Sequence, residues 1–307
     1  MPFRVVFVGS SVWGLQSLET LWSLPEIEVV GAVTNPEVFQ ISYRPSGVRN
    51  VNHADVAGAC EARGTPVYLM GAAEKMTSPA LREALVAWSP QLVFVMGWYH
   101  MVPKTLRDLA PTLGVHFSLL PDYAGGAPLV WALINGETET GATLFQFERG
   151  VDTGPIYDQV SVPIEPRDTI ATLYPRVGEA SLSMLRRALP EIAAGRLVGR
   201  PQPEAGRRQF PQRGPEDGEI DWTWDAQRVD AFVRAQTRPY PGAFTRWGGA
   251  PVHIWVARPG DAEASQPPGT FESGGETLVV HCGRGTLVVS EAGATPGGLP
   301  VRGRFPG

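Results

Sequence analysis

Short apolar runs alternate with helical patterns along the N-terminal part of this chain, and this alternation constrains its fold most strongly. Four runs have the length and β-branched content of buried strands: residues 3–8, 28–33, 92–96 and 113–117. Between these runs, apolar side chains recur at spacings of three and four, as on helices. Because parallel strands are joined by helical crossovers, the sequence predicts an α/β fold with a parallel sheet covered on both faces.

A second, smaller region follows. A long helical pattern over residues 168–195 closes the first domain, which we predict to span residues 1–204. The Arg-, Gln-, Pro- and Gly-rich segment 197–218 is typical of a linker. A short helix at 226–236 and several short strands then predict a β-rich, barrel-like domain over residues 205–307. Those strands are 243–247, 252–256, 278–281 and 287–289, with an irregular tail after Ser290.

Composition excludes several classes of protein. The 307 residues include 31 acidic and 26 basic side chains, and the net charge of −5 disfavours a nucleic-acid binder. Two cysteines cannot build a disulfide framework, and the five histidines lack a metal-ligand spacing. No apolar stretch has the length of a membrane span, and no leader pattern precedes the first strand. We therefore expect a cytoplasmic protein without a metal or a membrane partner.

The first strand-to-helix turn, Gly9 to Gly14, resembles a dinucleotide-binding fingerprint only in part. Ser11 stands where the middle glycine would be, and no acidic residue ends the second strand. These departures argue against NAD. They favour a tight turn with room for another ligand at the edge of the sheet. The next segment, residues 34–52, has no clear period and is predicted to be a loop.

Residues 113–128 carry the strongest chemical signal. His116 and Ser118 alternate at the end of a strand, so their side chains share a face. Asp152 follows the next strand, 143–147, in a glycine-containing turn from which it could reach His116. A carboxylate beside an imidazole orients the ring and favours its charged form, which suits acid–base chemistry. A structural histidine and a turn aspartate are the alternative interpretation.

Several segments together resemble the formyltransferases that use 10-formyltetrahydrofolate. They are VHFSLLP (115–121), NGETETGATL (135–144), DTGPI (152–156), PQRGPEDGEIDW (211–222) and RPYPGAF (238–244). The chain is most similar to sugar N-formyltransferases such as the UDP-aminoarabinose formyltransferase domain, and more distantly to methionyl-tRNA formyltransferase. The resemblance implies a Rossmann-like catalytic domain followed by a smaller OB-like domain.

The resemblance also implies a reaction and a site. It indicates N-formyl transfer from 10-formyltetrahydrofolate, or another tetrahydrofolate one-carbon form, to an amine of a small molecule such as a nucleotide-linked amino sugar. His116 and Asp152 would be catalytic. The pterin would be held at Met96, Gly97, Trp98, Val151 and Asp152. We expect Ser11, Ser118 and Tyr123 to contact the acceptor. By analogy with the related sugar enzymes, the chain could form a homodimer.

Two departures from the family pattern bear on the chemistry. The family's catalytic Asn corresponds to Gly114, and losing one such oxyanion donor costs on the order of 10²–10³ in rate. Ser118, a backbone N–H or a water could replace the amide. Alternatively, the enzyme could transfer a hydroxymethyl or methylene-level unit, or hydrolyse formyl-folate. A third alternative is a non-catalytic folate or sugar-nucleotide binding protein. Ala124 and Gly126 replace arginines of related enzymes, which disfavours an anionic group at that place. The acidic total and the roughly balanced charge after residue 205 disfavour a tRNA substrate.

Overall fold

We describe a computed structural model of the chain over residues 1–41, 44–203, 205–275, 277–293 and 298–306. The chain forms two compact units. The first contains Met1–Ala124, Gly141–Ser161 and Gly178–Arg207, and the second contains Gly125–Thr140, Val162–Val177 and Arg208–Gly307. The chain therefore passes between the units more than once. The sequence predicts two contiguous domains that meet at residue 204, and this boundary stays a prediction.

The sheet of the first unit has the strand order β10-β9-β7-β6-β1-β2-β5. Its parallel strands are β1 (Phe3–Val8), β2 (Ile27–Thr34), β5 (Val67–Leu69), β6 (Leu92–Val95) and β7 (Thr112–His116). Strand β9 (Glu139–Gln146) runs antiparallel to β7, and β10 (Ile156–Pro163) lies beside β9. This sheet confirms the predicted α/β class.

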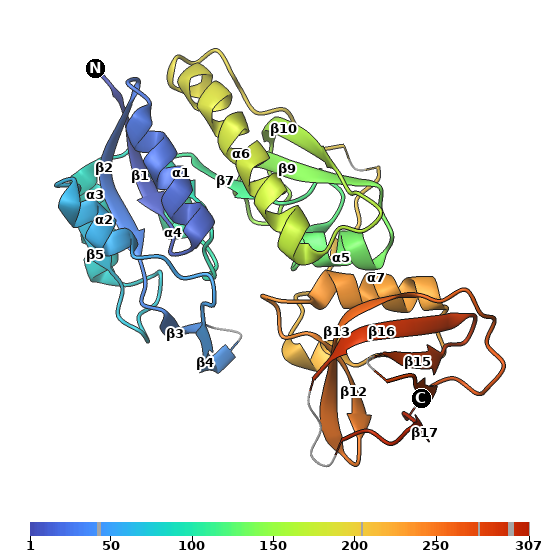
Figure 1. Cartoon of the computed structure of the whole chain (residues 1–307). Coiled ribbons are helices and arrows are strands. Elements are labelled where there is room, and N and C mark those ends of the chain that lie inside the picture. The colour runs from blue at the N-terminus through green and yellow to red at the C-terminus, as the bar shows by residue number, and fades with distance from the viewer. Residues whose placement is uncertain (42–43, 204, 276, 294–297, 307) are drawn as a thin grey trace. The chain divides into compact units, whose positions relative to one another are not determined.

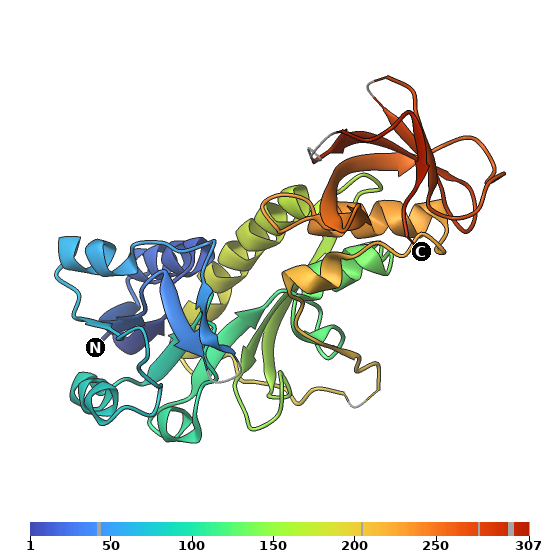
Figure 2. The same ribbon diagram turned by 90° about the horizontal axis from the view of Figure 1, so that it is seen from below.

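Helices cover both faces of the parallel strands (Figure 2). The blue helices α1 (Val12–Ser23) and α2 (Val56–Ala62) lie on one face, and the teal helices α3 (Pro79–Trp88) and α4 (Lys104–Arg107) lie on the other. Glycines allow close packing. A Cβ on Gly31 of β2 would lie 2.3 Å from the Trp88 ring of α3. Likewise, a Cβ on Gly178 of α6 (Ile170–Ala193) would lie 2.3 Å from the Trp13 ring of α1.

The prediction of a loop over residues 34–52 was wrong. This segment contains a hairpin of β3 (Val38–Ile41) and β4 (Arg44–Arg49), which pair antiparallel. The reason is a short alternation, in which Phe39 and Ile41 are buried while Val38 and Gln40 are exposed. Two buried side chains are too few to produce a recognisable strand pattern in the sequence.

The second unit contains an antiparallel sheet of order β12-β13-β16-β15-β14-β17. Its strands are β12 (Ala243–Trp247), β13 (Ala250–Pro259), β14 (Thr270–Ser273), β15 (Leu278–His281), β16 (Thr286–Ala292) and β17 (Arg302–Arg304). The expectation of an irregular tail after Ser290 was wrong for residues 291–292, which belong to β16, and for β17, which pairs with β14. Residues 294–297 and 307 of this tail lie outside the described residues. Hydrogen bonding to partner strands, rather than side-chain pattern, makes these residues strands.

Helical elements complete the second unit. Helix α7 (Ala226–Gln236) lies along β13 and β16 (Figure 1) and also packs against α5 (Pro128–Ile134). The 3₁₀ helix η1 (Pro215–Gly218) precedes α7. The short strands β8 (Ala124–Gly125) and β11 (Gln209–Phe210) pair with each other. This β-rich unit confirms the predicted class of the second domain. None of the helices in the described residues is both long and apolar enough to cross a membrane.

A buried carboxylate of the second unit forms ion pairs with two arginines of the same unit. Asp230 of α7 is 4% exposed. It accepts two hydrogen bonds of 3.1 Å from Arg167 Nη1 and one of 2.8 Å from Arg234 Nε. Removing one partner of a buried ion pair leaves the other charge without compensation.

We predict that Asp230→Ala lowers the free energy of unfolding by about 3–5 kcal/mol, because Arg234 loses its buried counter-charge. Calorimetric unfolding measures the effect. The matched control is Glu219→Ala, which removes the exposed partner of Arg246 and should cost no more than about 1 kcal/mol. Equal losses in both variants would contradict the prediction.

Candidate active site

The site begins where the sheet changes its direction of winding, between β1 and β6. In open α/β sheets, ligands bind outside the carboxyl ends of the strands at such a point. The turns after the two strands touch through their backbones: Ser10 N donates to Gly97 O at 3.3 Å. A Cβ on Gly9 would lie 2.3 Å from Met96 O, so glycine is required for this approach.

His116 is the last residue of β7, and one of its ring nitrogens is hydrogen-bonded within the protein. Its Nε2 lies 2.8 Å from the carbonyl oxygen of Tyr123. Since a carbonyl oxygen can only accept, Nε2 carries a hydrogen. In the neutral ring, Nδ1 is then unprotonated and can accept a proton. Tyr123 itself is buried and has a left-handed backbone (φ +54°), which belongs to the turn that presents this carbonyl.

Asp152 faces the other side of the same ring. Its Oδ2 lies 3.8 Å from His116 Nδ1, and the two side chains are 20% and 12% exposed. This distance is within ion-pair range but too long for a direct hydrogen bond. Asp152 also has a left-handed backbone (φ +50°). The structure thus brings together the two residues predicted to be catalytic, with Nδ1 of the His116 ring facing the Asp152 carboxylate.

An aromatic ring fills the space beside Gly114. Strand β7 places Gly114 two residues before His116, where the family resemblance expects an amide. A Cβ built on Gly114 would lie 2.7 Å from the Phe147 ring and 2.8 Å from Val95 O. Phe147 packs against Phe145 at 5.0 Å, and Phe145 meets the edge of His116 at 6.5 Å. The wall next to His116 is therefore apolar.

The hydroxyls predicted to contact the acceptor have internal partners. Ser118 is 1% exposed, and its Oγ donates to Asp122 O at 2.7 Å. Ser11 is buried as the N-cap of α1, and its Oγ accepts from Gly14 N at 3.1 Å. Both hydroxyls hold turns at the carboxyl edge of the sheet. In this arrangement the Ser118 proton is not directed to a ligand.

The residues predicted to hold the pterin lie in two turns. Met96 is buried, and Gly97 has φ +64° in the turn after β6. Trp98 Nε1 is buried and has no hydrogen-bond partner among the described residues. Val151 is 43% exposed beside Asp152. Their contact with a cosubstrate stays a prediction. The described residues contain no group of three or more side chains that could hold a metal ion.

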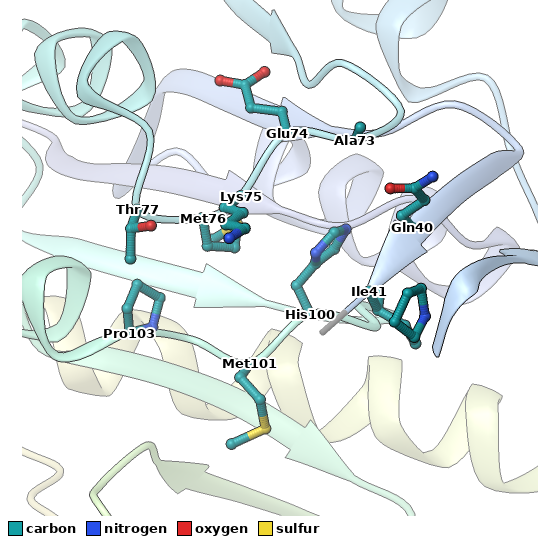
Figure 3. A pocket seen from close by; sticks show the side chains of 11 residues that line it. Gln40, Ile41, Ala73, Glu74, Lys75, Met76, Thr77, His100, Met101 and Pro103 are labelled. Atoms are coloured by element: carbon teal, nitrogen blue, oxygen red, sulfur yellow. The ribbon is translucent and has the colours of Figure 1, made fainter. Parts of the chain in front are cut away.

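A separate pocket of about 510 Å³ opens between the β3–β4 hairpin, the segment before α3 and the segment after β6 (Figure 3). Its lining is mainly apolar, with Ile41, Met76 and Met101, and His100 also borders it. The His100 ring stacks on Phe39 at 5.2 Å and contacts the tilted ring of Trp98 at 5.1 Å. Burial lowers the pKa of His100, so its neutral form is favoured.

The sequence matches the formyl transferase family over residues 29–189 and the formyl transferase C-terminal domain over residues 213–297. Three solved structures illustrate the similarity of fold. HypX from Aquifex aeolicus in complex with tetrahydrofolic acid is 20% identical, with a TM-score of 0.61 over 95% of this chain. The N-formyltransferase from Helicobacter canadensis, in complex with folinic acid and dTDP-3-aminofucose, is 17% identical, with a TM-score of 0.72 over 94% of this chain and 99% of its own.

The third structure, methionyl-tRNA formyltransferase from Clostridium thermocellum, is 16% identical, with a TM-score of 0.56 over 85% of this chain and 95% of its own. The chain spans only 44% of the length of HypX. The α/β unit, the β-rich unit and the match over more than half of the sequence define a formyltransferase fold. The chain belongs to the formyl transferase family.

We predict that Gly114→Ala destabilises the protein by about 1–3 kcal/mol, because the methyl group overlaps the Phe147 ring and Val95 O. Denaturant unfolding measures the loss. The double variant Gly114→Ala/Phe147→Ala should stay less stable than Phe147→Ala alone, since the Val95 carbonyl remains in place. Gly71→Ala is the control, because its added Cβ meets no atom closer than 3.7 Å. An unchanged stability of Gly114→Ala would show that the strand can move aside.

We also predict that His100 titrates below the ordinary histidine pKa of about 6.5. Between the two values the unfolded chain binds a proton that the folded chain does not. His100 therefore contributes stability above about pH 6.5 that is lost as the pH falls through its folded pKa. Proton NMR of the ring Cε1–H gives the midpoint. A midpoint at or above that of the denatured chain would contradict the prediction.

Proposed function

We propose that this chain transfers a formyl group from 10-formyltetrahydrofolate to an amine of a small molecule, and that a nucleotide-linked amino sugar is the leading acceptor. The observation that carries this proposal is the approach of His116 Nδ1 to Asp152 Oδ2 at 3.8 Å, at the carboxyl edge of the sheet in a formyl transferase family chain. Met96, Gly97, Trp98, Val151 and Asp152 are the proposed contacts of the cosubstrate.

The geometry supports the following sequence of steps. The acceptor amine attacks the formyl carbon, and a tetrahedral centre with a negatively charged oxygen forms. His116 Nδ1, unprotonated in the neutral ring, takes the proton that the attacking nitrogen loses. Asp152 stabilises the resulting imidazolium. The bond between the carbon and N10 of the folate then breaks, and N10 takes up the proton from His116. Alignment of the two substrates supplies much of the rate.

The solved structures support the choice of substrates. HypX was crystallised with tetrahydrofolic acid, and the Helicobacter canadensis enzyme with folinic acid and an amino-sugar nucleotide. Because Ala124 and Gly126 provide no cationic side chain, any pyrophosphate of the acceptor is proposed to bind elsewhere. Ser11, Ser118 and Tyr123 are proposed to shape the acceptor side of the site through the turns that they hold, since both serine hydroxyls are hydrogen-bonded internally. Homodimer formation, the absence of a nucleic-acid partner and a cytoplasmic location stay predictions.

Phe147 favours one alternative reaction. Its ring contacts the position that the Cβ of a side chain at residue 114 would take, so it leaves little room there for an amide. Transfer from a methylene-level tetrahydrofolate proceeds through an iminium carbon, and no oxyanion forms. Hydroxymethyl transfer is therefore the second candidate, because it does not need the missing donor.

The test is to incubate the purified protein with 10-formyltetrahydrofolate, or with the methylene form, and a panel of amino-sugar nucleotides and simple amines. We expect an acceptor that gains CO in mass with the formyl donor. A gain of CH₂O with the methylene donor would instead establish the second candidate. Release of formate without a modified acceptor would identify a hydrolase.

His116→Ala should lower the transfer rate by about 10²–10⁴-fold, because the proton acceptor is lost. Folate binding, measured by fluorescence quenching, should persist in this variant. A wild-type protein that binds folate but modifies no amine, or a His116→Ala variant with full turnover, would overturn the proposed mechanism.

A further inference from the structure

The turn that carries Asp152 has no regular secondary structure of its own to hold it. It lies between β9 and β10, and Asp152 adopts a left-handed backbone that costs a non-glycine residue free energy. Such a conformation persists only when the surroundings determine it. The position of the carboxylate against His116 therefore depends on what grips this turn.

Part of the predicted linker holds this turn in place. We call residues 199–203 the strap. Ile156 and Arg200 exchange two backbone hydrogen bonds of 2.8 Å, which pair the strap with the start of β10. Gly199 allows the approach, since a Cβ there would lie 2.7 Å from Pro155 Cβ. The backbone pairing places Gln202 next to the Asp152 turn.

The side chain of Gln202 bridges the turn. Its Nε2 donates to Asp152 O at 2.8 Å and to Gly154 O at 2.7 Å. Because both partners are carbonyl oxygens, the amide must present its NH₂ group to them and not its oxygen. Arg207 adds hydrogen bonds to the carbonyls of Val151 and Asp152. Asp152 O thus accepts from two side chains that both lie outside the turn.

We propose that Gln202 is a positioning residue for catalysis, which fixes the Asp152 carboxylate against His116 by bridging the carbonyls of Asp152 and Gly154. Its hydrogen bonds go to the carbonyl oxygens of Asp152 and Gly154, so it acts through the backbone of the turn. This inference rests on the proposed function of the His116–Asp152 pair. The bridge itself has a readout that does not depend on turnover.

Gln202→Glu is the sharpest variant, because it keeps the shape and exchanges the NH₂ donor for an oxygen that repels both carbonyls. We expect kcat to fall by about 10- to 100-fold, as small misplacements of catalytic groups do. In the Asp152→Asn background the same change should lower kcat by less than about threefold, because the carboxylate to be positioned is already gone. A purely structural role of Gln202 would give the same loss in both backgrounds and would overturn the proposal.

Hydrogen–deuterium exchange separates the bridge from the reaction. The peptide that contains residues 150–155 should exchange faster in Gln202→Glu than in the wild type. Gln209→Glu is the matched control, since Gln209 is an exposed glutamine of β11, and it should change neither exchange nor kcat. Unchanged exchange in Gln202→Glu would overturn the proposal whatever the activity. Faster exchange in a wild-type background that shows no transfer would refute the proposed function and leave the bridge established.

Discussion

The site depends on one approach, that of Asp152 Oδ2 to His116 Nδ1 at 3.8 Å. Neither side chain fixes this distance alone. The ring is oriented from behind by the carbonyl of Tyr123, which forces the hydrogen onto Nε2 and leaves Nδ1 for the carboxylate. The carboxylate is delivered by a turn with a left-handed residue. One anchor is a backbone carbonyl and the other is a backbone turn, so the paths of two turns set the acid–base pair.

Gly114 changes the side chains that border this pair. Phe147 lies against Gly114, and the aromatic ring beside His116 is that of Phe145, at 6.5 Å. In the proposed formyl transfer, a developing oxyanion would then depend on the protonated imidazole of His116. The same ring nitrogen would have to take the amine proton before it could offer it to that oxygen. The order of these two events decides whether formyl or methylene-level transfer suits the site better.

Sequence reasoning found the sheet from its strand pattern, and it found His116 and Asp152 because each follows the end of a strand. Only His116 lies at the shared carboxyl edge of the parallel strands. Strand β9 runs antiparallel to β7, so Asp152 reaches His116 through the path of the turn between β9 and β10. It missed the antiparallel strands β3 and β4, where only two side chains of β3 mark the buried face. Phe147 could be placed on the face of Phe145 from their spacing. Its contact with Gly114, however, follows from the register of β9 on β7, which the sequence does not reveal.

Gln202 escaped prediction because its segment has the composition of a linker. Glycine, proline and arginine are frequent in connections between domains, and they also suit a chain that must run close to another backbone. At Gly199 the second reason applies, since Pro155 leaves no room for a side chain. The backbone bonds between Arg200 and Ile156 then make the segment part of the first unit up to Arg207. The boundary predicted at residue 204 keeps Gln202 with the first domain but separates Arg207 from the aspartate turn to which it donates hydrogen bonds.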